Sequence, residues 1–567
     1  MNFKLHVGDL LQKATGMELE KILGILETPP DERLGDVAFP CFSLSRTLRK
    51  APPLIAQDIC GKIEIDEYID RINVASGYVN FYFNRKAFVK SIINDVIIQG
   101  ADYGKSKEGN GKKIIVEFSS PNIAKPFHIG HLFSTAVGNS LQKIFSFMGY
   151  ETVKINHLGD WGTQFGKLIC AYERWGNREV IDNDPINELL KIYVKFHEEA
   201  AKDPSLDDEA RKNFKKLEQN DPETVALWSY FREVSLKEFN RMYDLLGISF
   251  DSFAGESFYS DKMADVIDTL KTKNLLVESD GAYIVNLEEQ SLPPCIIIKS
   301  DGATIYATRD LAAAIYRKNT YDFFKNIYVV GTPQTLHFKQ VISILGKMDY
   351  TWAQDCVHVG FGLVKFPDKK LSTRNGDVVL LEEVLSTSIQ KTKEIILANN
   401  NINIEDVEEV SKKIGVGAIL FTFLKNGREK DIIFSWEDIL DFEGESGPCV
   451  QYSYARCKSI LRKAAEASIN YNDADLTLVV ADEEYQLVKL LNNYSDVIKD
   501  ASVKYEPSCV TRYVTDVAQQ FNRFYNNCPI MKSEDNLKKA RLMLTEATSI
   551  CIKSALALIG VDVVERM

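Results

Sequence analysis

Apolar and polar residues change their spacing several times along this chain, and each change predicts a different kind of element. Residues 72–83 alternate in a way that is typical of β-strands. Residues 113–118 contain a short continuous apolar run, which predicts a buried strand, and residues 129–148 place apolar side chains at helical spacing. Another strand is predicted over 151–156. A strand, a helix and a strand in this order indicate the parallel unit of a doubly wound α/β fold.

Beyond this unit the pattern changes twice more. Polar helices between about residues 181 and 247 are interpreted as an insertion packed on the parallel core. After about residue 405 the spacing is almost wholly helical; Leu487, Leu490 and Leu491, for example, recur at intervals of three and four. This predicts a helical bundle of roughly 120 residues. Further strands are predicted at 283–285, 296–299, 327–330 and 357–361.

The chain has 567 residues, which is too long for one hydrophobic core, so these patterns define several domains. We predict a multidomain fold of the α/β plus α class. Its parts are a small α+β domain over 1–108, a Rossmann-like doubly wound core over 109–405 that carries the insertion, a helical connection over 406–448 and an α-helical bundle over 449–567.

Composition is that of an ordinary globular protein, with 45% hydrophobic and 26% charged residues. The apolar runs fall far short of the roughly 18 residues that a membrane helix needs. His6 and Asp9 interrupt the N-terminal segment where a signal peptide would be apolar. We therefore expect a cytoplasmic protein without a membrane partner. The ten cysteines form no C-x-x-C pair, which argues against a metal site or a disulfide framework.

The net charge of −12 argues weakly against a nucleic-acid partner, because phosphate contacts need lysine and arginine. It does not exclude such a partner, because a large acidic protein can be basic on one face. Basic residues in the C-terminal third are candidates for that face, although a solvated helix face explains each of them equally well when taken alone.

The most informative segment is 121–131, P-N-I-A-K-P-F-H-I-G-H, which follows a predicted strand and opens a predicted helix. A helix N-terminus offers unpaired N–H groups and a positive dipole end to a phosphate. Gly130 allows a nucleotide to approach the backbone, and His128 and His131 lie on the same first turn. These residues predict a nucleotide-binding unit. A metal site is the weaker interpretation, because no third ligand is evident nearby.

This segment resembles the H-I-G-H signature of class I aminoacyl-tRNA synthetases. Its flanks, E-F-S-S-P-N at 117–122 and L-G-D-W-G-T-Q-F-G at 158–166, are similar to those of arginyl-tRNA synthetases, and the resemblance extends over nearly the whole chain. It implies an arginine–tRNA ligase that converts L-arginine and ATP, with Mg²⁺ on the phosphates, to arginyl-adenylate. The arginyl group then passes to the 3′-terminal ribose of tRNA-Arg. In this chemistry His128 and His131 are catalytic and ATP-binding residues, and Gly130 is an ATP-binding residue.

The stretch 370–377, K-L-S-T-R-N-G-D, resembles the second class I signature, K-M-S-K-S, in an altered S-T-R form. The resemblance implies an ATP-binding and catalytic role for Ser372. Thr373 stands where the general pattern has the lysine that stabilises the pyrophosphate leaving group. In the family, the lysine at the position of Lys125 is thought to compensate. Arg374 could share the role, and the sequence leaves both possibilities open.

An arginine substrate presents a planar, always charged fork of five N–H donors, which only correctly spaced carboxylates satisfy. The resemblance places the two acids and the tyrosine of the family's pocket on Glu117, Asp310 and Tyr306. It places the residues that meet the α-amino and carboxyl groups of the substrate on Asn122 and Gln334. Taken alone, Asp310 is also explained as a simple helix cap.

Contacts to tRNA are implied at both ends of the chain. The segments around Tyr452 and Tyr525 resemble the anticodon-binding domain of the family, and these tyrosines are suited to stacking on unpaired bases. Burial in the bundle core explains each of them equally well. The N-terminal domain resembles the one that contacts the corner of the tRNA, where Asn80 and Phe83 match positions that meet the D-loop.

Four alternatives differ in testable ways. A cysteinyl-type synthetase needs a zinc site for which no Cys/His cluster stands out, and the acid pair Glu117 and Asp310 would repel the substrate of a glutamyl-type enzyme. A small nucleotidylyltransferase would lack both the S-T-R loop and the helical tail. A non-catalytic tRNA-binding paralogue of the same fold would not exchange pyrophosphate into ATP. A monomer fits the family, whereas the sequence leaves the isoacceptor preference undetermined.

Overall fold

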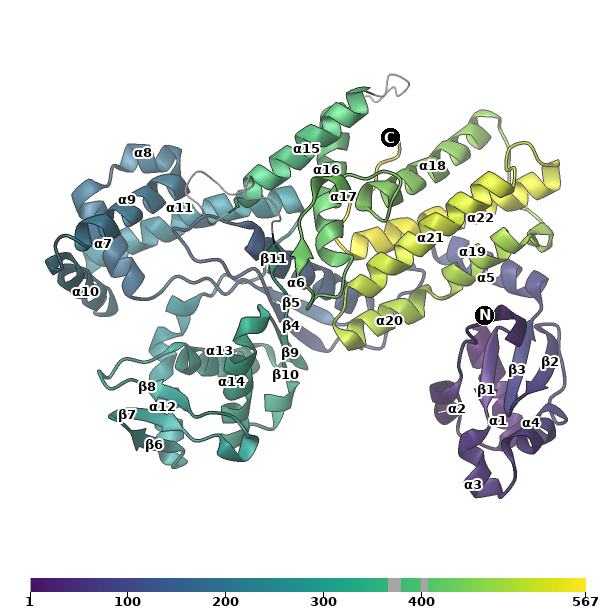
Figure 1. The fold of residues 1–567 in the computed structure, drawn as a ribbon, viewed down its shortest axis with the longest axis horizontal. Coiled ribbons are helices and arrows are strands. Elements are labelled where there is room, and N and C mark those ends of the chain that lie inside the picture. The colour runs from purple at the N-terminus through teal and green to yellow at the C-terminus, as the bar shows by residue number, and fades with distance from the viewer. Residues whose placement is uncertain (1, 366–378, 399–405) are drawn as a thin grey trace.

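Four parallel strands form the central sheet of the computed structural model, which describes residues 2–365, 379–398 and 406–567 (Figure 1). The strand order is β10-β9-β4-β5, and Ile115 at the centre of β4 lies opposite Val153 on one side and Asn326 on the other. The predicted doubly wound core is therefore confirmed. These strands are β4 (Lys113–Glu117), β5 (Glu151–Ile155), β9 (Lys325–Val329) and β10 (Cys356–Val359).

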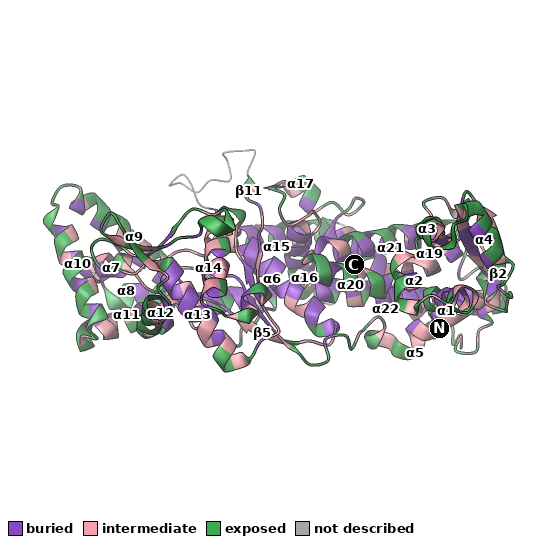
Figure 2. Ribbon diagram, turned by 90° about the horizontal axis from the view of Figure 1, so that it is seen from below, coloured by how far each residue is buried: buried purple, intermediate pink, exposed green. Residues whose placement is uncertain are grey.

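Helix α6 (Ile129–Phe147) connects β4 to β5 and is buried along most of its length. It packs against the sheet on one side and against helices of the C-terminal part on the other (Figure 2). A β-carbon added at Gly138 would lie 2.2 Å from the Phe118 side chain, so the absence of a side chain allows α6 to approach the end of β4. An apolar residue pattern on nearly all faces of α6 matches this burial.

Two lobes extend from the sheet. The first holds the insertion, and its helices pack into a separate group (Figure 1). The second holds a three-stranded antiparallel sheet of order β6-β7-β8, so the strands predicted at 283–285 and 296–299 do not belong to the central sheet. The helices of the first lobe are α7 (Thr163–Trp175), α8 (Arg178–Asn183), α9 (Pro185–Ala200), α10 (Ser205–Glu218) and α11 (Pro222–Leu246). The second lobe holds β6 (Leu276–Ser279), β7 (Ala282–Val285), β8 (Cys295–Ile298), α12 (Met263–Thr272), α13 (Tyr306–Tyr321) and α14 (Thr335–Lys347).

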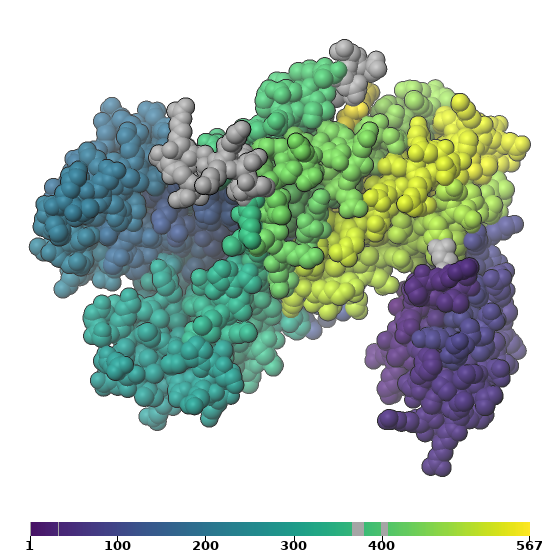
Figure 3. Space-filling view, viewed as in Figure 1, coloured from purple at the N-terminus to yellow at the C-terminus, as the bar shows by residue number. Residues whose placement is uncertain are grey.

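The N-terminal part is a small α+β unit that projects from the rest of the molecule (Figure 3). Its antiparallel sheet has the order β1-β3-β2. Helix α5 (Arg85–Gln99), capped by the side chain of Asn84, leaves this unit and packs against α19 and α22. The other elements are α1 (Phe3–Thr15), α2 (Leu19–Ile25), β1 (Val37–Pro40), α3 (Ser45–Leu48), α4 (Pro52–Cys60), β2 (Ile69–Ala75) and β3 (Tyr78–Phe83).

The C-terminal part is helical, as the apolar spacing predicts. Its core contains the buried ion pair between Nε of Arg541 and Oε1 of Glu484, at 2.6 Å. None of the helices in the described ranges is both long and apolar enough to cross a membrane. The elements are β11 (Val364–Lys365), α15 (Leu381–Ala398), α16 (Val407–Leu424), β12 (Ile432–Ile433), α17 (Trp436–Ile439), α18 (Gly447–Glu466), α19 (Asp482–Asn492), α20 (Tyr494–Lys504), α21 (Ser508–Asn527) and α22 (Asp535–Leu558).

Candidate functional site

Two stacked histidines begin helix α6. Nδ1 of His128 accepts a hydrogen bond from the backbone N–H of Gly130 at 3.1 Å, and Nδ1 of His131 accepts one from the backbone N–H of His128 at 3.2 Å. The ring centroids are 3.7 Å apart. Because both Nδ1 atoms are acceptors, the neutral rings carry their protons on Nε2. Each histidine therefore keeps one Nε2–H donor for a ligand.

Both histidines are neutral near pH 7. Burial lowers the pKa of His131 to about 3, and the nearby charges of His128 and Lys125 add to this effect. Burial also lowers the pKa of His128. Within the described part of the chain, Lys125 has no carboxylate within ion-pair distance, and its charge acts on His131. A β-carbon at Gly130 would lie 3.0 Å from the His128 ring, so glycine at this position leaves room for the imidazole.

The loop between β4 and α6 has an unusual backbone that sequence patterns did not predict. Ser119, Ser120 and Ala124 have φ angles of 72°, 49° and 58°, in the left-handed region that L-residues rarely adopt. Helix α11 supports this loop, because the hydroxyls of Ser119 and Tyr243 are 2.7 Å apart and the Ala124 N–H donates to Oγ of Ser235. Such strain persists only where the surroundings enforce it, and it concentrates at functional sites.

Residues 379–381, which follow the second signature, form backbone hydrogen bonds with the residues around the histidine pair. The N–H of Ile129 donates to the carbonyl of Val379 at 3.0 Å, and the N–H of Leu381 donates to the carbonyl of Phe127 at 3.0 Å. Val379 and Leu381 therefore lie beside the N-terminus of α6. Ser372 and Arg374, the two residues of this signature with expected roles, lie outside the described residues.

The two expected pocket acids have partners of different kinds. Oε2 of Glu117, at the carboxyl end of β4, lies 2.5 Å from Nη2 of Arg317, a wholly buried residue of α13. Oδ2 of Asp310 lies 2.5 Å from Nε2 of His337 in the first turn of α14. A permanently charged arginine of this chain thus neutralises Glu117, whereas a titratable histidine is the partner of Asp310.

The remaining predicted arginine ligands lie on the same elements. Tyr306 is four residues before Asp310 on α13, which puts both on one helix face, and it is 67% exposed. Gln334 is exposed and precedes His337 by three residues. Asn122 pairs with Gly159, where a β-carbon would lie 1.9 Å from the Asn122 Oδ1 atom. Close packing of Asn122 on this glycine loop therefore holds its amide in place.

Glu256 is a buried acid near Asp310 that the sequence interpretation missed. Its Oε2 lies 3.2 Å from Nη1 of Arg309, the neighbour of Asp310 on α13. Burial raises the pKa of Glu256 to about 7, and the charges of Asp310 and Asp160 add to this rise. No local motif marked Glu256. The nearest sequence signal was the L-G-D-W-G segment, whose Asp160 accepts hydrogen bonds from Ser257, the residue after Glu256.

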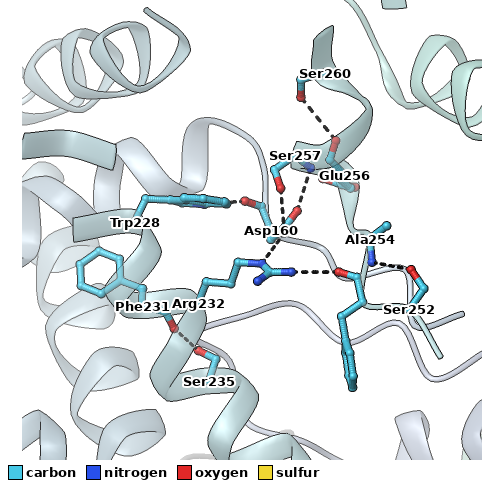
Figure 4. Close-up of polar contacts among 11 residues, drawn as sticks. Asp160, Trp228, Phe231, Arg232, Ser235, Ser252, Ala254, Glu256, Ser257 and Ser260 are labelled. Carbon is cyan, nitrogen blue, oxygen red and sulfur yellow. Dashed lines mark hydrogen bonds and ion pairs between the residues drawn. The ribbon is translucent and has the colours of Figure 1, made fainter. Parts of the chain in front are cut away.

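The Asp160 carboxylate anchors the turn that begins with Glu256 (Figure 4). Oδ1 accepts the backbone N–H of Ser257 at 2.8 Å, and Oδ2 accepts its hydroxyl at 2.9 Å. Nε of Arg232, from helix α11, lies 3.2 Å from the same Oδ2 atom, and the guanidinium also donates to the carbonyl of Phe253. The insertion therefore helps to position Glu256.

On the C-terminal bundle, the two tyrosines predicted to contact RNA lie side by side with an arginine between them. Tyr452 on α18 is 38% exposed and Tyr525 on α21 is 41% exposed. The guanidinium carbon of Arg456 is 4.7 Å from the first ring centroid and 5.0 Å from the second. Among the described residues Arg456 has no acidic partner, and Asn522 accepts a hydrogen bond from it. The alternative of burial in the bundle core is excluded.

The two N-terminal candidates are not presented on the surface. Asn80 is 3% exposed in the middle strand β3, and Phe83 is 7% exposed and packs against Phe3 and Phe88. Both side chains therefore belong to the core of this small domain, and their contact with the D-loop stays a prediction. Of these two residues, only Phe83 lines the cleft of about 1270 Å³ between this domain and the C-terminal bundle. The basic residues of that cleft are Arg33, Arg71, Arg85, Lys86, Lys489 and Arg523.

Comparisons with known proteins cover the whole chain. Family models match at 1–83 (Arginyl tRNA synthetase N terminal domain), 92–436 (tRNA synthetases class I (R), catalytic domain) and 450–567 (DALR anticodon binding domain). The chain is 56% identical to an arginine–tRNA ligase of Clostridium botulinum strain 657 and 55% identical to one of Clostridium kluyveri strain ATCC 8527, with 100% of each chain covered.

Two solved structures share the fold. The arginyl-tRNA synthetase of Thermus thermophilus matches with a TM-score of 0.82 at 22% identity, covering 100% of both chains. That of Plasmodium falciparum matches with a TM-score of 0.81 at 24% identity, covering 100% of this chain and 99% of the other. Together with the family models and the full-length relatives, these matches show that the chain belongs to the arginyl-tRNA synthetases of class I.

Proposed function

We propose that this chain is an arginine–tRNA ligase that activates L-arginine with ATP and transfers the arginyl group to the 3′-terminal ribose of tRNA-Arg. One observation carries the proposal: a pair of neutral histidine donors at a helix N-terminus lies one short loop away from a buried acid at the end of β4. Full-length identity of 56% to a curated ligase supports it.

ATP binding is assigned to the N-terminus of α6. The Nε2–H groups of His128 and His131 donate to the α-phosphate, where negative charge builds as the arginine carboxylate attacks. Neutral imidazoles suit this task, since their donors do not titrate near pH 7. Gly130 leaves the backbone open to the nucleotide. Lys125, which has no ion-pair partner among the described residues, offers its charge to the leaving pyrophosphate. Ser372 and Arg374 belong to the second signature. Ser372 is assigned to ATP binding and catalysis, and Arg374 shares the stabilisation of the pyrophosphate.

The guanidinium of L-arginine is assigned to the acids of the pocket. Asp310 is the primary carboxylate, Glu117 is the second acid, and Tyr306 covers the aliphatic stem from the same helix face as Asp310. The amide groups of Asn122 and Gln334 meet the α-amino and carboxyl groups. Since no covalent enzyme intermediate is needed, positioning and electrostatics supply most of the catalysis.

Mg²⁺ is assigned to the phosphates of ATP, whose charge it shields. Within the described residues there is no group of three His, Cys, Asp or Glu side chains that could hold a metal ion, so the proposal gives the ion no protein ligand set. The residues that do act on ATP are the histidine pair and Lys125, which bind and orient the phosphates.

tRNA is assigned to the C-terminal bundle and the cleft beside it. Tyr452 and Tyr525 are exposed and flank Arg456, an arrangement that suits stacking on unpaired anticodon bases. The basic residues of the cleft suit phosphates of the tRNA body. The proposal includes a monomer in the cytoplasm and the domain division 1–108, 109–405, 406–448 and 449–567, with the insertion at about 181–247.

The proposal is tested by pyrophosphate exchange into ATP, measured on the full-length protein with tRNA present. Exchange is expected with L-arginine and not with L-lysine, and Asp310→Ala is expected to abolish it. A matched control is Asp349→Ala, a surface aspartate paired with Lys273 outside the pocket, which is expected to retain full exchange. Absence of exchange with every amino acid, despite measurable tRNA binding, would favour the non-catalytic paralogue.

A further inference from the structure

The acids around the arginine pocket are neutralised unequally. Three of them each face an arginine of this chain, whose charge is permanent in the physiological pH range. These pairs are Glu117 with Arg317 at 2.5 Å, Glu256 with Arg309 at 3.2 Å and Asp160 with Arg232 at 3.2 Å. The fourth acid, Asp310, faces His337 at 2.5 Å. Asp310 is therefore the pocket acid whose own partner can lose its charge.

We propose that protonated His337 supplies the positive charge beside Asp310 before the amino acid binds, and that L-arginine binding expels a proton from His337. The inference rests on the assignment of Asp310 as the guanidinium ligand. It adds a proton-linked step and a positioning residue, His337, to the binding of the amino acid.

The geometry supports this role. Helices α13 and α14 are in contact, and Asp310 on the first faces His337 on the second. Both side chains are partly exposed, so solvent reaches the pair. Two cations held on one partly buried carboxylate repel each other in a medium of low dielectric constant. The histidine charge therefore has to leave when the guanidinium arrives.

The step balances as a single proton transfer to solvent. Before binding, the imidazolium carries protons on both ring nitrogens, and its Nε2–H donates to Oδ2 of Asp310. On binding, the Nδ1 proton passes to water, and the neutral ring keeps its Nε2–H donor toward the carboxylate. The pocket thus exchanges the charge of one cation for that of another, and Asp310 stays ionised throughout.

The electrostatic surroundings agree with this assignment. Burial lowers the pKa of His337, but the hydrogen bond and charge of Asp310 and the charge of Glu117 outweigh burial, and the net result is a raised pKa. His358 on β10 and His157 also face this pair, and His358 has its own pKa lowered, first by burial. Below the raised pKa, arginine has to displace the proton, so its affinity falls as the pH falls.

Glu256 is the competing source of a proton, because burial raises its pKa to about 7 and an arriving cation would also favour its ionised form. Two variants separate the candidates. His337→Gln keeps an uncharged N–H donor for Asp310 and removes the titration, whereas Glu256→Gln removes the titration of the glutamate alone. His197→Gln, on helix α9 of the insertion, is the control for the loss of a histidine outside the pocket.

The experiment is calorimetric titration of L-arginine into the full-length protein from pH 5.5 to 8.0, in two buffers of different ionisation enthalpy. At the acidic end the wild type is expected to release close to one proton, and its Kd to rise about tenfold per pH unit. In His337→Gln the release from this group is lost and the Kd becomes much less dependent on pH. Glu256→Gln and His197→Gln are expected to retain the release. Thermal unfolding checks that each variant is folded.

Two outcomes would overturn the inference while leaving the proposed function intact. One is arginine binding by the wild type with no proton release and a constant Kd over this pH range. The other is a release that persists in His337→Gln and disappears in Glu256→Gln, which would assign the proton to the glutamate. Failure of the wild type to bind arginine at any pH, with tRNA and ATP present, would instead contradict the proposed function.

Discussion

Nη2 of Arg317 lies 2.5 Å from Oε2 of Glu117, and the arginine side chain has no exposed surface. Nη2 is also 3.4 Å from Nδ1 of His157. Removal of one partner from such a pair leaves an uncompensated charge in the interior, whereas removal of both is much better tolerated. Arg317 therefore fixes the position of Glu117 at the end of β4.

We predict that Arg317→Met lowers stability by about 3–5 kcal/mol, because the Glu117 carboxylate loses its buried counter-charge. Thermal and denaturant unfolding measure the change. The double variant Arg317→Met/Glu117→Gln is expected to recover part of the loss. Lys318→Met, which removes an ion pair to the exposed Asp322 on the same helix, is the control and is expected to cost less than about 1 kcal/mol. An Arg317→Met protein as stable as the wild type would contradict this account of the pair.

The lowered pKa of His131 predicts a pH dependence of stability. In the unfolded chain this histidine titrates near 6.5, whereas burial lowers the pKa to about 3 in the folded protein. Between these values the unfolded state binds a proton that the folded state does not, so stability falls as the pH decreases below about 6.5. His131→Asn is expected to show a smaller loss of thermal stability from pH 7.5 to pH 5.0 than the wild type. An equal loss in both proteins would show that His131 is not buried neutral.

The strand–helix–strand core and the C-terminal bundle were predictable, because the apolar spacing of β4, α6, β5 and α21 reports local structure directly. For Tyr452 and Tyr525 the sequence left exposure and burial equally open, and the structure shows that both are exposed. Arg317 and Glu256 were not found, because their roles come from partners far away in the sequence, and no local pattern marks such a pair. The left-handed backbone of the loop after β4 was missed for the same reason, since contacts from α11 enforce it.

Asn80 and Phe83 were singled out by their motif positions, and the sequence did not show that both side chains are buried. Residues 80 and 83 lie on opposite faces of β3, and alternation did not show that this middle strand buries side chains on both faces. In the structure Phe83 completes an aromatic cluster with Phe3 and Phe88. The neighbouring cleft is lined by exposed charged side chains of both signs, among them Arg85 and Asp482.

Lys125→Ala is predicted to impair adenylate formation far more than arginine binding. Lys125 has no carboxylate partner among the described residues and lies close enough to the histidine pair to lower the pKa of His131. Its charge is therefore available to a phosphate leaving group. Single-turnover activation and equilibrium arginine binding measure the two effects, with Lys4→Ala on the exposed surface of α1 as the control. An unchanged activation rate would remove Lys125 from this role and leave Arg374 as the remaining candidate.

Arg456→Ala is predicted to weaken tRNA binding about five- to a hundredfold, because a guanidinium held between two exposed rings supports stacking worth about 1–3 kcal/mol. The Kd for L-arginine is expected to stay unchanged, since the residue lies on the bundle. Filter binding with tRNA-Arg measures the loss, and Lys463→Ala, an exposed residue of the same helix, is the control. Equal effects of the two variants would show that Arg456 contributes only general positive charge.

The most direct test of the account is aminoacylation of total tRNA with labelled arginine, lysine, glutamate and cysteine in parallel. The acid pocket around Asp310 and the neutral donors of α6 predict charging with arginine alone, and Asp310→Ala is expected to abolish it while the protein remains folded. Charging with another of these amino acids, or no charging with any of them by folded protein that binds tRNA, would contradict the account.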